Sequence, residues 1–163
     1  YQFREIALID FFDKLLAEAE LVAKEYGVKV YFDRPSNPVK IWADVNKLGI
    51  AISNLVDNAI KYNVPNGTVT LKIEPSASEP FVEVSIKDTG VGIPEEEVKN
   101  VFSKFFRASN ILQSKVEGSG LGLYITKNVI ERHGGKIKME SVLNRGTTFY
   151  FTLPTDQKLI PSR

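Results

Sequence analysis

The chain has 163 residues, of which 43% are hydrophobic and 25% charged, proportions that fit one soluble globular domain with a sizeable core. Its formal net charge of +1 gives no electrostatic reason to expect a nucleic-acid partner, and the lack of cysteine excludes disulfides and thiol chemistry. A single histidine without cysteine argues against a zinc site, and no apolar run approaches the length of a membrane span.

The first part of the chain predicts two long helices and two short strands. Apolar side chains recur at helical spacing over residues 8–26, and Gly27 is expected to end that helix. Short strands are expected at 28–32 and 39–42. A second helix is expected over 44–62, because it opens with an aspartate, a favoured N-cap residue.

Alternating apolar residues predict four more strands, at 69–73, 82–86, 137–139 and 149–153. A short helix near 95–106, an irregular loop at 108–117 and a helix opening with the glycines of 118–122 lie among them. Strands in neighbouring pairs with helices inserted predict an α+β fold, a two-layer sandwich whose sheet has one face covered by helices. Since the chain begins without methionine and ends in a polar tail, 155–163, we expect a single domain over 1–154 that belongs to a longer protein.

Residues 118–122 read Gly-Ser-Gly-Leu-Gly. Glycines let a backbone approach a ligand closely, and a helix N-terminus offers unpaired N–H groups and a positive dipole end to an anion. The segment therefore predicts a phosphate site. A Rossmann site is not indicated, because these glycines follow an irregular loop instead of a strand, and no Walker-type loop occurs.

Asp88 continues the apolar face of residues 82–86, so its carboxylate is expected to point inward. A carboxylate withdrawn from water needs hydrogen-bond donors. Gly90 and Gly92 follow at once and permit a loop that follows a flat ligand. The alternative is an ordinary exit from a strand into a turn, where aspartate and glycine are favoured.

Asn54, Asn58 and Lys61 lie on one flank of the second predicted helix, beside its apolar stripe. Asparagine is unfavourable inside a helix, so this pair indicates a ligand or a hydrogen-bond network. An amide oxygen suits magnesium, which usually arrives bridging phosphates. The alternative is a solvated helix face, and Asp57 is expected to be a solvated residue of this kind.

Two further polar residues have plain structural interpretations. Arg107 ends an aromatic segment, 101–107, and can be a surface charge beside core packing. The unpatterned loop at 108–117 that follows it suits a lid over a bound ligand. His133 precedes two glycines and is interpreted as a helix end in preference to a catalytic histidine.

Taken together and in this order, these segments resemble the ATP-binding catalytic domain of sensor histidine kinases, in the group that also includes type II topoisomerases, heat-shock chaperones and mismatch-repair ATPases. The resemblance covers about residues 5–154 and rests on five motifs: an asparagine box at 54–62, a first glycine box at 88–94, a phenylalanine box at 101–107, a second glycine box at 118–123 and a third at 146–149. It implies the Bergerat ATP-binding fold with a mixed, mostly antiparallel sheet.

The resemblance also implies ATP and Mg²⁺ as ligands. Asp88 would accept a hydrogen bond from the adenine amino group, Thr147 would support the base through water, and Asn58 would ligate magnesium. The other residues it places at the nucleotide are Asn54, Lys61, Tyr62, Gly90, Gly92, Ile93, Arg107, Gly118, Ser119, Gly120, Leu121, Gly122 and Leu123. Of these, Asn54 would position the phosphates and their water, and Lys61 and Arg107 would neutralise phosphate charge during catalysis.

The phosphoacceptor histidine of these kinases is not in this sequence, since His133 lies in the wrong motif. The resemblance therefore implies transfer to a histidine on a separate dimerisation domain, relay to a response-regulator aspartate, a monomeric fragment and a cytoplasmic location, whether or not the parent protein is membrane-anchored. Asn54 stands where hydrolytic relatives carry a carboxylate, which favours a kinase over an ATPase. The alternatives are a serine kinase of the anti-sigma type and a non-catalytic nucleotide-binding module.

Overall fold

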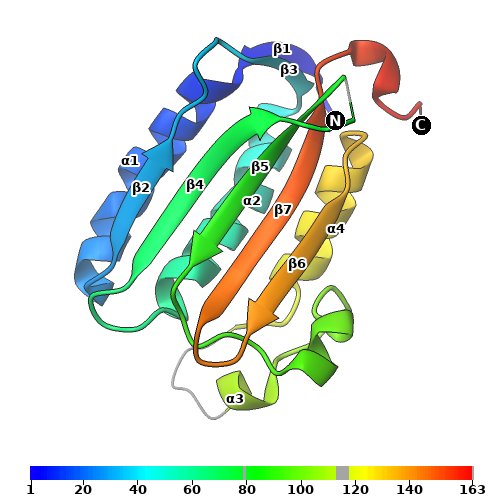
Figure 1. The fold of residues 1–163 in the computed structure, drawn as a ribbon. Helices are drawn as coiled ribbons and strands as arrows, with labels where there is room; N and C mark the ends of the chain where they lie inside the picture. The colour runs from blue at the N-terminus through cyan, green and yellow to red at the C-terminus, as the bar shows by residue number, and fades with distance from the viewer. Residues whose placement is uncertain (79, 113–117, 163) are drawn as a thin grey trace.

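The computed structural model describes residues 1–78, 80–112 and 118–162, and its elements form a layer of strands and a layer of helices (Figure 1). The main sheet has five strands in the order β2 (Lys29–Asp33), β4 (Thr68–Pro75), β5 (Phe81–Asp88), β7 (Gly146–Pro154) and β6 (Ile137–Val142). β2 pairs with β4 in parallel, and the other three pairings are antiparallel. The sheet is therefore mixed and mostly antiparallel.

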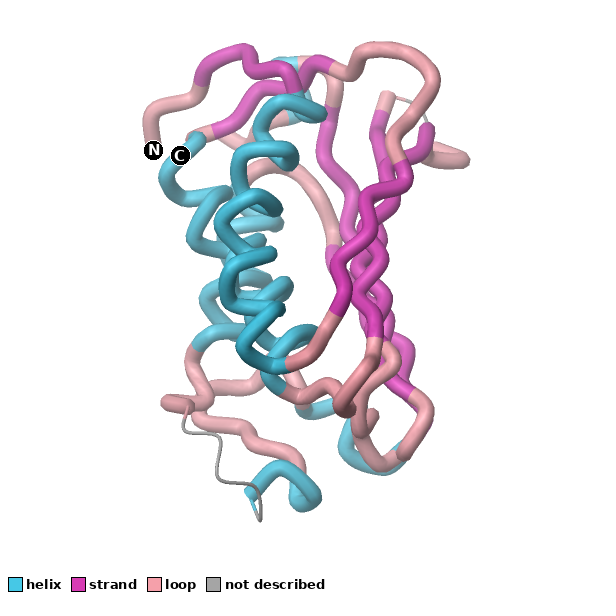
Figure 2. The backbone as a smooth tube through the Cα atoms, turned by 90° about the vertical axis from the view of Figure 1, so that its left-hand side faces the viewer, coloured by secondary structure: helices cyan, strands magenta, loops and turns pink. Residues whose placement is uncertain are grey.

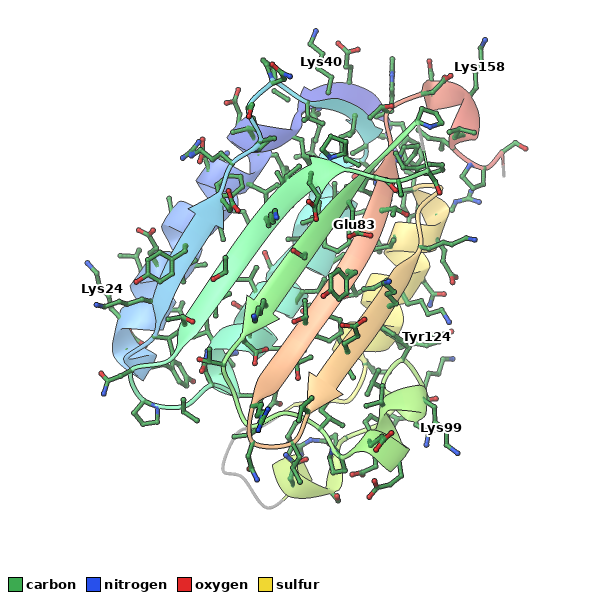
Figure 3. All side chains as sticks on the ribbon, in the orientation of Figure 1. Lys24, Lys40, Glu83, Lys99, Tyr124 and Lys158 are labelled. Carbon is green, nitrogen blue, oxygen red and sulfur yellow. The ribbon has the colours of Figure 1, made fainter. Side chains whose placement is uncertain are left out.

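The helices gather on one face of this sheet, as the side view in Figure 2 shows. They are α1 (Leu8–Tyr26), α2 (Val45–Lys61) and α4 (Gly122–Arg132), with the short α3 (Ser109–Leu112) and the 3₁₀ turns η1 (Glu95–Asn100) and η2 (Gln157–Leu159) nearby. The opposite face is open and carries polar side chains such as Glu83 (Figure 3). The predicted two-layer sandwich is confirmed. Within the described ranges, no helix has both the length and the apolar character of a membrane span.

One end of each long helix is set by a local feature. Gly27 ends α1 in the left-handed conformation, with a φ of 68°. Asp44 caps α2, because its carboxylate accepts a hydrogen bond of 3.0 Å from the Lys47 N–H. The apolar stripe of α2, which includes the fully buried Leu48 and Leu55, then packs into the core together with Ile86 of β5.

Several elements differ from the prediction, among them α3 and η2, which lie within the expected loop 108–117 and the expected tail 155–163. The helix expected at 95–106 is only the 3₁₀ turn η1. Phe105 adopts a φ of 62°, a left-handed conformation that cannot be part of a right-handed helix. The Phe105 N–H donates instead to the Gly120 carbonyl at 2.9 Å, so this segment is held by the second glycine motif. β1 (Arg4–Ala7) was not predicted; it pairs with β3 (Lys40–Ala43) in a separate two-stranded sheet. Its mostly exposed side chains leave no apolar pattern to detect.

His133 lies immediately after α4, as predicted, and its side chain is completely buried. Nε2 accepts a hydrogen bond of 3.1 Å from the Asp44 N–H, so Nδ1 carries the proton and donates to the Val129 carbonyl at 2.8 Å. Burial lowers the pKa of this imidazole, and a neutral ring satisfies both contacts. The interpretation of His133 as a structural residue is confirmed.

Candidate functional site

Two adjoining cavities lie where α2 and α4 meet one end of the sheet. Their volumes are about 240 Å³ and about 70 Å³. Five residues line both of them: Asn58, Tyr62, Ile93, Ile111 and Leu123. The two cavities therefore form one continuous site whose ends differ in chemistry.

The smaller cavity contains a carboxylate among apolar side chains. Asp88 is 8% exposed, and its Oδ1 accepts hydrogen bonds from the Gly90 N–H at 2.8 Å and the Thr147 N–H at 3.1 Å. Burial raises the pKa of Asp88 to about 6, even though both hydrogen bonds act to lower it. The predicted inward direction is confirmed. Both backbone donors converge on Oδ1, so within the described part of the chain Oδ2 remains available as an acceptor.

The loop after Asp88 is held against neighbouring backbone. Gly92 has a φ of 66°, and a Cβ added there would lie 2.1 Å from the Val142 carbonyl oxygen. A Cβ on Gly90 would lie 2.4 Å from the Tyr62 carbonyl oxygen. The two glycines thus allow the loop to pack closely against the backbone of Tyr62 and Val142. Only Gly92 also lines the site.

The larger cavity is polar along α2. Asn54, Asn58 and Lys61 all line it, as their common flank predicts. Asn54 Nδ2 lies 3.5 Å from the Gly122 carbonyl oxygen, so this flank meets the first turn of α4. Asp57, which we expected to be only a solvated surface residue, lines the same cavity and places a carboxylate there.

The second glycine motif and Arg107 complete this cavity. Gly118, Ser119 and Gly120 line it just before α4, which begins at Gly122 as predicted. Gly120 has a φ of 73°, and a Cβ there would lie 2.7 Å from the Phe105 backbone. The predicted lid, 108–117, is described only to residue 112; residues 113–117 lie outside the described residues.

Every predicted site residue except Gly90 and Leu121 lines one of the two cavities. Sequence reasoning found Ile93 and Leu123 but missed the rest of the apolar wall, which consists of Val91, Val101, Phe106, Ala108, Ile111 and Phe149. Phe149 could have been found, because it lies on the inward face of β7 and pairs with Ile86 on β5. The others lie in irregular segments or, for Ile111, in the four-residue helix α3, which is too short for a periodic pattern to reveal.

Comparison with known proteins finds a matching family model and several similar chains. Residues 43–157 match the family model described as histidine kinase-, DNA gyrase B- and HSP90-like ATPase. The chain is 36% identical over 155 residues to sensor histidine kinase WalK of Bacillus subtilis, covering 94% of this chain and 25% of WalK. It is 37% identical over 129 residues to the adaptive-response sensory kinase SasA of Synechococcus elongatus, covering 79% and 33%. The chain thus spans about a quarter to a third of these relatives.

Solved structures show the same likeness. The catalytic domain of histidine kinase ThkA superposes with a TM-score of 0.82 at 29% identity, covering 98% of this chain and 99% of that one. The mycobacterial sensor histidine kinase MprB gives a TM-score of 0.81 at 28% identity, covering 93% and 97%. A further match, with a TM-score of 0.77 at 27% identity and covering 96% and 42%, is ThkA in complex with the response regulator protein TrrA.

Proposed function

The chain belongs to the family of histidine kinase-, DNA gyrase B- and HSP90-like ATPases, and on that premise we propose that residues 1–154 are the ATP-binding catalytic domain of a longer sensor histidine kinase. Its reaction is transfer of the ATP γ-phosphoryl group to a histidine on a separate domain. The observation that carries the proposal is the continuity of the site. An apolar cavity that contains a buried carboxylate opens into a polar cavity lined by cationic side chains and glycines.

The smaller cavity suits a purine base. Asp88 Oδ2 can accept a hydrogen bond from the amino group of adenine, and Ile93 and Phe149 supply apolar surface for the ring. Thr147 lines the same end and can contact the base directly or through a water molecule. These contacts orient adenine so that its phosphates extend into the larger cavity.

The larger cavity suits the phosphates. Lys61 and Arg107 offset their negative charge, and the backbone N–H groups around Gly118–Gly122 can cradle phosphate oxygens. Asn54 is a neutral amide and a poor base, so it does not activate water for hydrolysis. Catalysis by these residues therefore consists of charge stabilisation and of holding the γ-phosphoryl group in line with the incoming nucleophile.

The donor set also fits a magnesium ion that arrives with ATP. The described residues contain no group of three or more His, Cys, Asp or Glu side chains that could hold a metal ion alone. Asn58 lies at the junction of the two cavities, and its amide oxygen is a hard ligand of the kind that magnesium prefers. When bound, the ion would neutralise charge on the phosphate oxygens.

The acceptor must come from outside the chain, because His133 is buried away from the site. Asn54 lines both the larger cavity and a groove of about 820 Å³ between α1 and α2, which leaves the phosphate end open to a second domain. We propose that this domain is the dimerisation domain of the same parent protein and that a response-regulator aspartate receives the phosphoryl group next.

The function is tested by incubating the chain with γ-labelled ATP, magnesium and a separately supplied histidine-containing dimerisation domain. Acid-labile, base-stable label on that domain is expected, and a version lacking its histidine should stay unlabelled. Label on serine would instead support a serine kinase of the anti-sigma type. Nucleotide binding without any transfer would support a non-catalytic module.

Asn58→Ala is expected to weaken ATP binding by at least about tenfold when magnesium is present, an effect of the size usual for groups that hold or orient a metal. Without magnesium its affinity should stay near that of the wild type. Titration calorimetry with and without the ion measures both values. Asn46→Ala, an exposed position on the first turn of the same helix, is the matched control. Equal losses under both conditions would contradict a metal role for Asn58.

A further inference from the structure

Ser141 on β6 has a role that no sequence motif predicts. It follows Ile137 and Met139 at alternate positions, so it lies on the inward face of the strand. A polar residue there parallels Asp88, which continues the inward face of β5. Ser141 does not line either cavity, but it contacts two residues that line the small one, Ile93 and Thr147, and the backbone of Gly146, which precedes Thr147.

The three contacts converge on the Ser141 hydroxyl. The Ile93 N–H donates to Ser141 Oγ at 2.8 Å, the Gly146 carbonyl oxygen lies 3.1 Å from it, and Thr147 Oγ1 lies 2.8 Å from it. The turn after β6, residues 143–145, holds the loop at a second point, where the Asn144 N–H donates to the Val91 carbonyl at 2.7 Å. The end of β6 and the turn that follows it therefore hold the loop that forms one wall of the base site.

The hydroxyl of Ser141 has a single hydrogen, and this determines which of its contacts it donates and which it accepts. A serine hydroxyl donates one hydrogen bond and accepts two. If Ser141 donates to the Gly146 carbonyl, it can accept from both Ile93 and Thr147, and all three contacts become hydrogen bonds. If it donates to Thr147 instead, the contact with the Gly146 carbonyl is lost. The first arrangement makes one more hydrogen bond, so it turns the Thr147 hydrogen away from the cavity.

We propose that Ser141 is a positioning residue that makes Thr147 an acceptor at the base site and so favours a 6-aminopurine over a 6-oxopurine. The inference rests on the proposed ATP-binding function. Asp88 and Thr147 then present two acceptors to the edge of the base. The amino group of adenine, or a water molecule beside it, can donate to this pair. A 6-oxo group would face two acceptors and be disfavoured.

The test compares the affinities of ATP and inosine triphosphate, whose base carries an oxo group in place of the 6-amino group and a hydrogen on N1. Ser141→Thr keeps the hydroxyl. Ser141→Val has nearly the same shape as the threonine variant but lacks the hydroxyl. We expect the wild type and Ser141→Thr to prefer ATP. In Ser141→Val the Thr147 hydrogen is free to turn toward an oxo group, and the ATP preference should fall by about tenfold, the value of roughly one hydrogen bond.

The control is Ser85→Val on β5, which pairs with Tyr150 on the open face of the sheet and should leave the preference unchanged. Thermal unfolding of each variant separates lost preference from lost structure, and Ser141→Ala replaces Ser141→Val if the latter does not fold. The inference is overturned if removing the hydroxyl leaves the preference intact or if Ser141→Thr loses as much. A wild type that binds ATP and inosine triphosphate equally overturns it too. If the wild type binds neither, the proposed function itself fails.

Discussion

Asp88→Asn is expected to abolish or strongly weaken ATP binding and, at pH 7, to make the unliganded protein more stable. The amide oxygen of asparagine can still accept the two backbone hydrogen bonds that reach Oδ1. Its amide nitrogen, however, is a donor and would face the amino group of adenine, so ligand and protein would present donor to donor. A charged acceptor is also lost, and together these changes should weaken binding by at least about a hundredfold.

The gain in stability follows from the raised pKa of Asp88. Its pKa rises from 3.8 to about 6 on folding, because burial disfavours the charged carboxylate. A group whose pKa is raised on folding stabilises the native state fully below its unfolded pKa, and that stabilisation is lost as pH rises through its folded pKa. The wild type should therefore lose on the order of 3 kcal/mol of stability between about pH 4 and pH 6. Asparagine does not ionise, so this loss should be absent from the variant.

Both effects are measurable on the purified chain. Denaturant unfolding across pH 4 to 7 gives the stability curves, and calorimetry gives the ATP affinity, which in the wild type should rise as pH increases through about 6. Asp33→Asn, at an exposed position on β2, is the control and should change neither property. Unchanged nucleotide affinity in Asp88→Asn would refute the assignment of this carboxylate to the base.

Gly92→Ala is the second substitution with a large expected effect. A Cβ at this position would lie 2.1 Å from the Val142 carbonyl oxygen and 2.7 Å from its carbon, and both atoms belong to a backbone that cannot swing aside. The φ of 66° adds a cost of about 1–2 kcal/mol for a residue with a side chain. We expect a loss of a few kcal/mol in stability and a displaced loop. ATP binding should fall more than tenfold even where the variant is folded.

Gly49→Ala is the matched control for this prediction. Gly49 lies within α2, its added Cβ would meet nothing within 4 Å, and its φ is not in the left-handed region. Alanine should therefore stabilise the protein by about 0.5–1 kcal/mol and leave ATP binding unchanged. Urea unfolding and nucleotide titration of both variants provide the comparison. A Gly92→Ala protein as stable as the wild type would show that the loop does not pack against β6 as described.

Much of the fold and of the candidate site could be predicted because the relevant patterns are local. Helical spacing and a terminal glycine predicted α1, and the period of two along β5 predicted that Asp88 points inward. The helical period also grouped Asn54, Asn58 and Lys61 on one flank, and all three line one cavity. Each of these inferences needs only residues a few positions apart.

Local patterns in the chain therefore specify the kind of chemistry and the elements that carry it. Which groups come into contact depends on how those elements pack. Ser141 reaches Ile93 and Thr147 only because β6 pairs with β7 in one register and their turn packs on the loop after β5. Asp57 lines the site only because of how α2 lies beside it, and β1 exists only through its pairing with β3. These contacts join residues far apart in the chain, and no local periodicity records them.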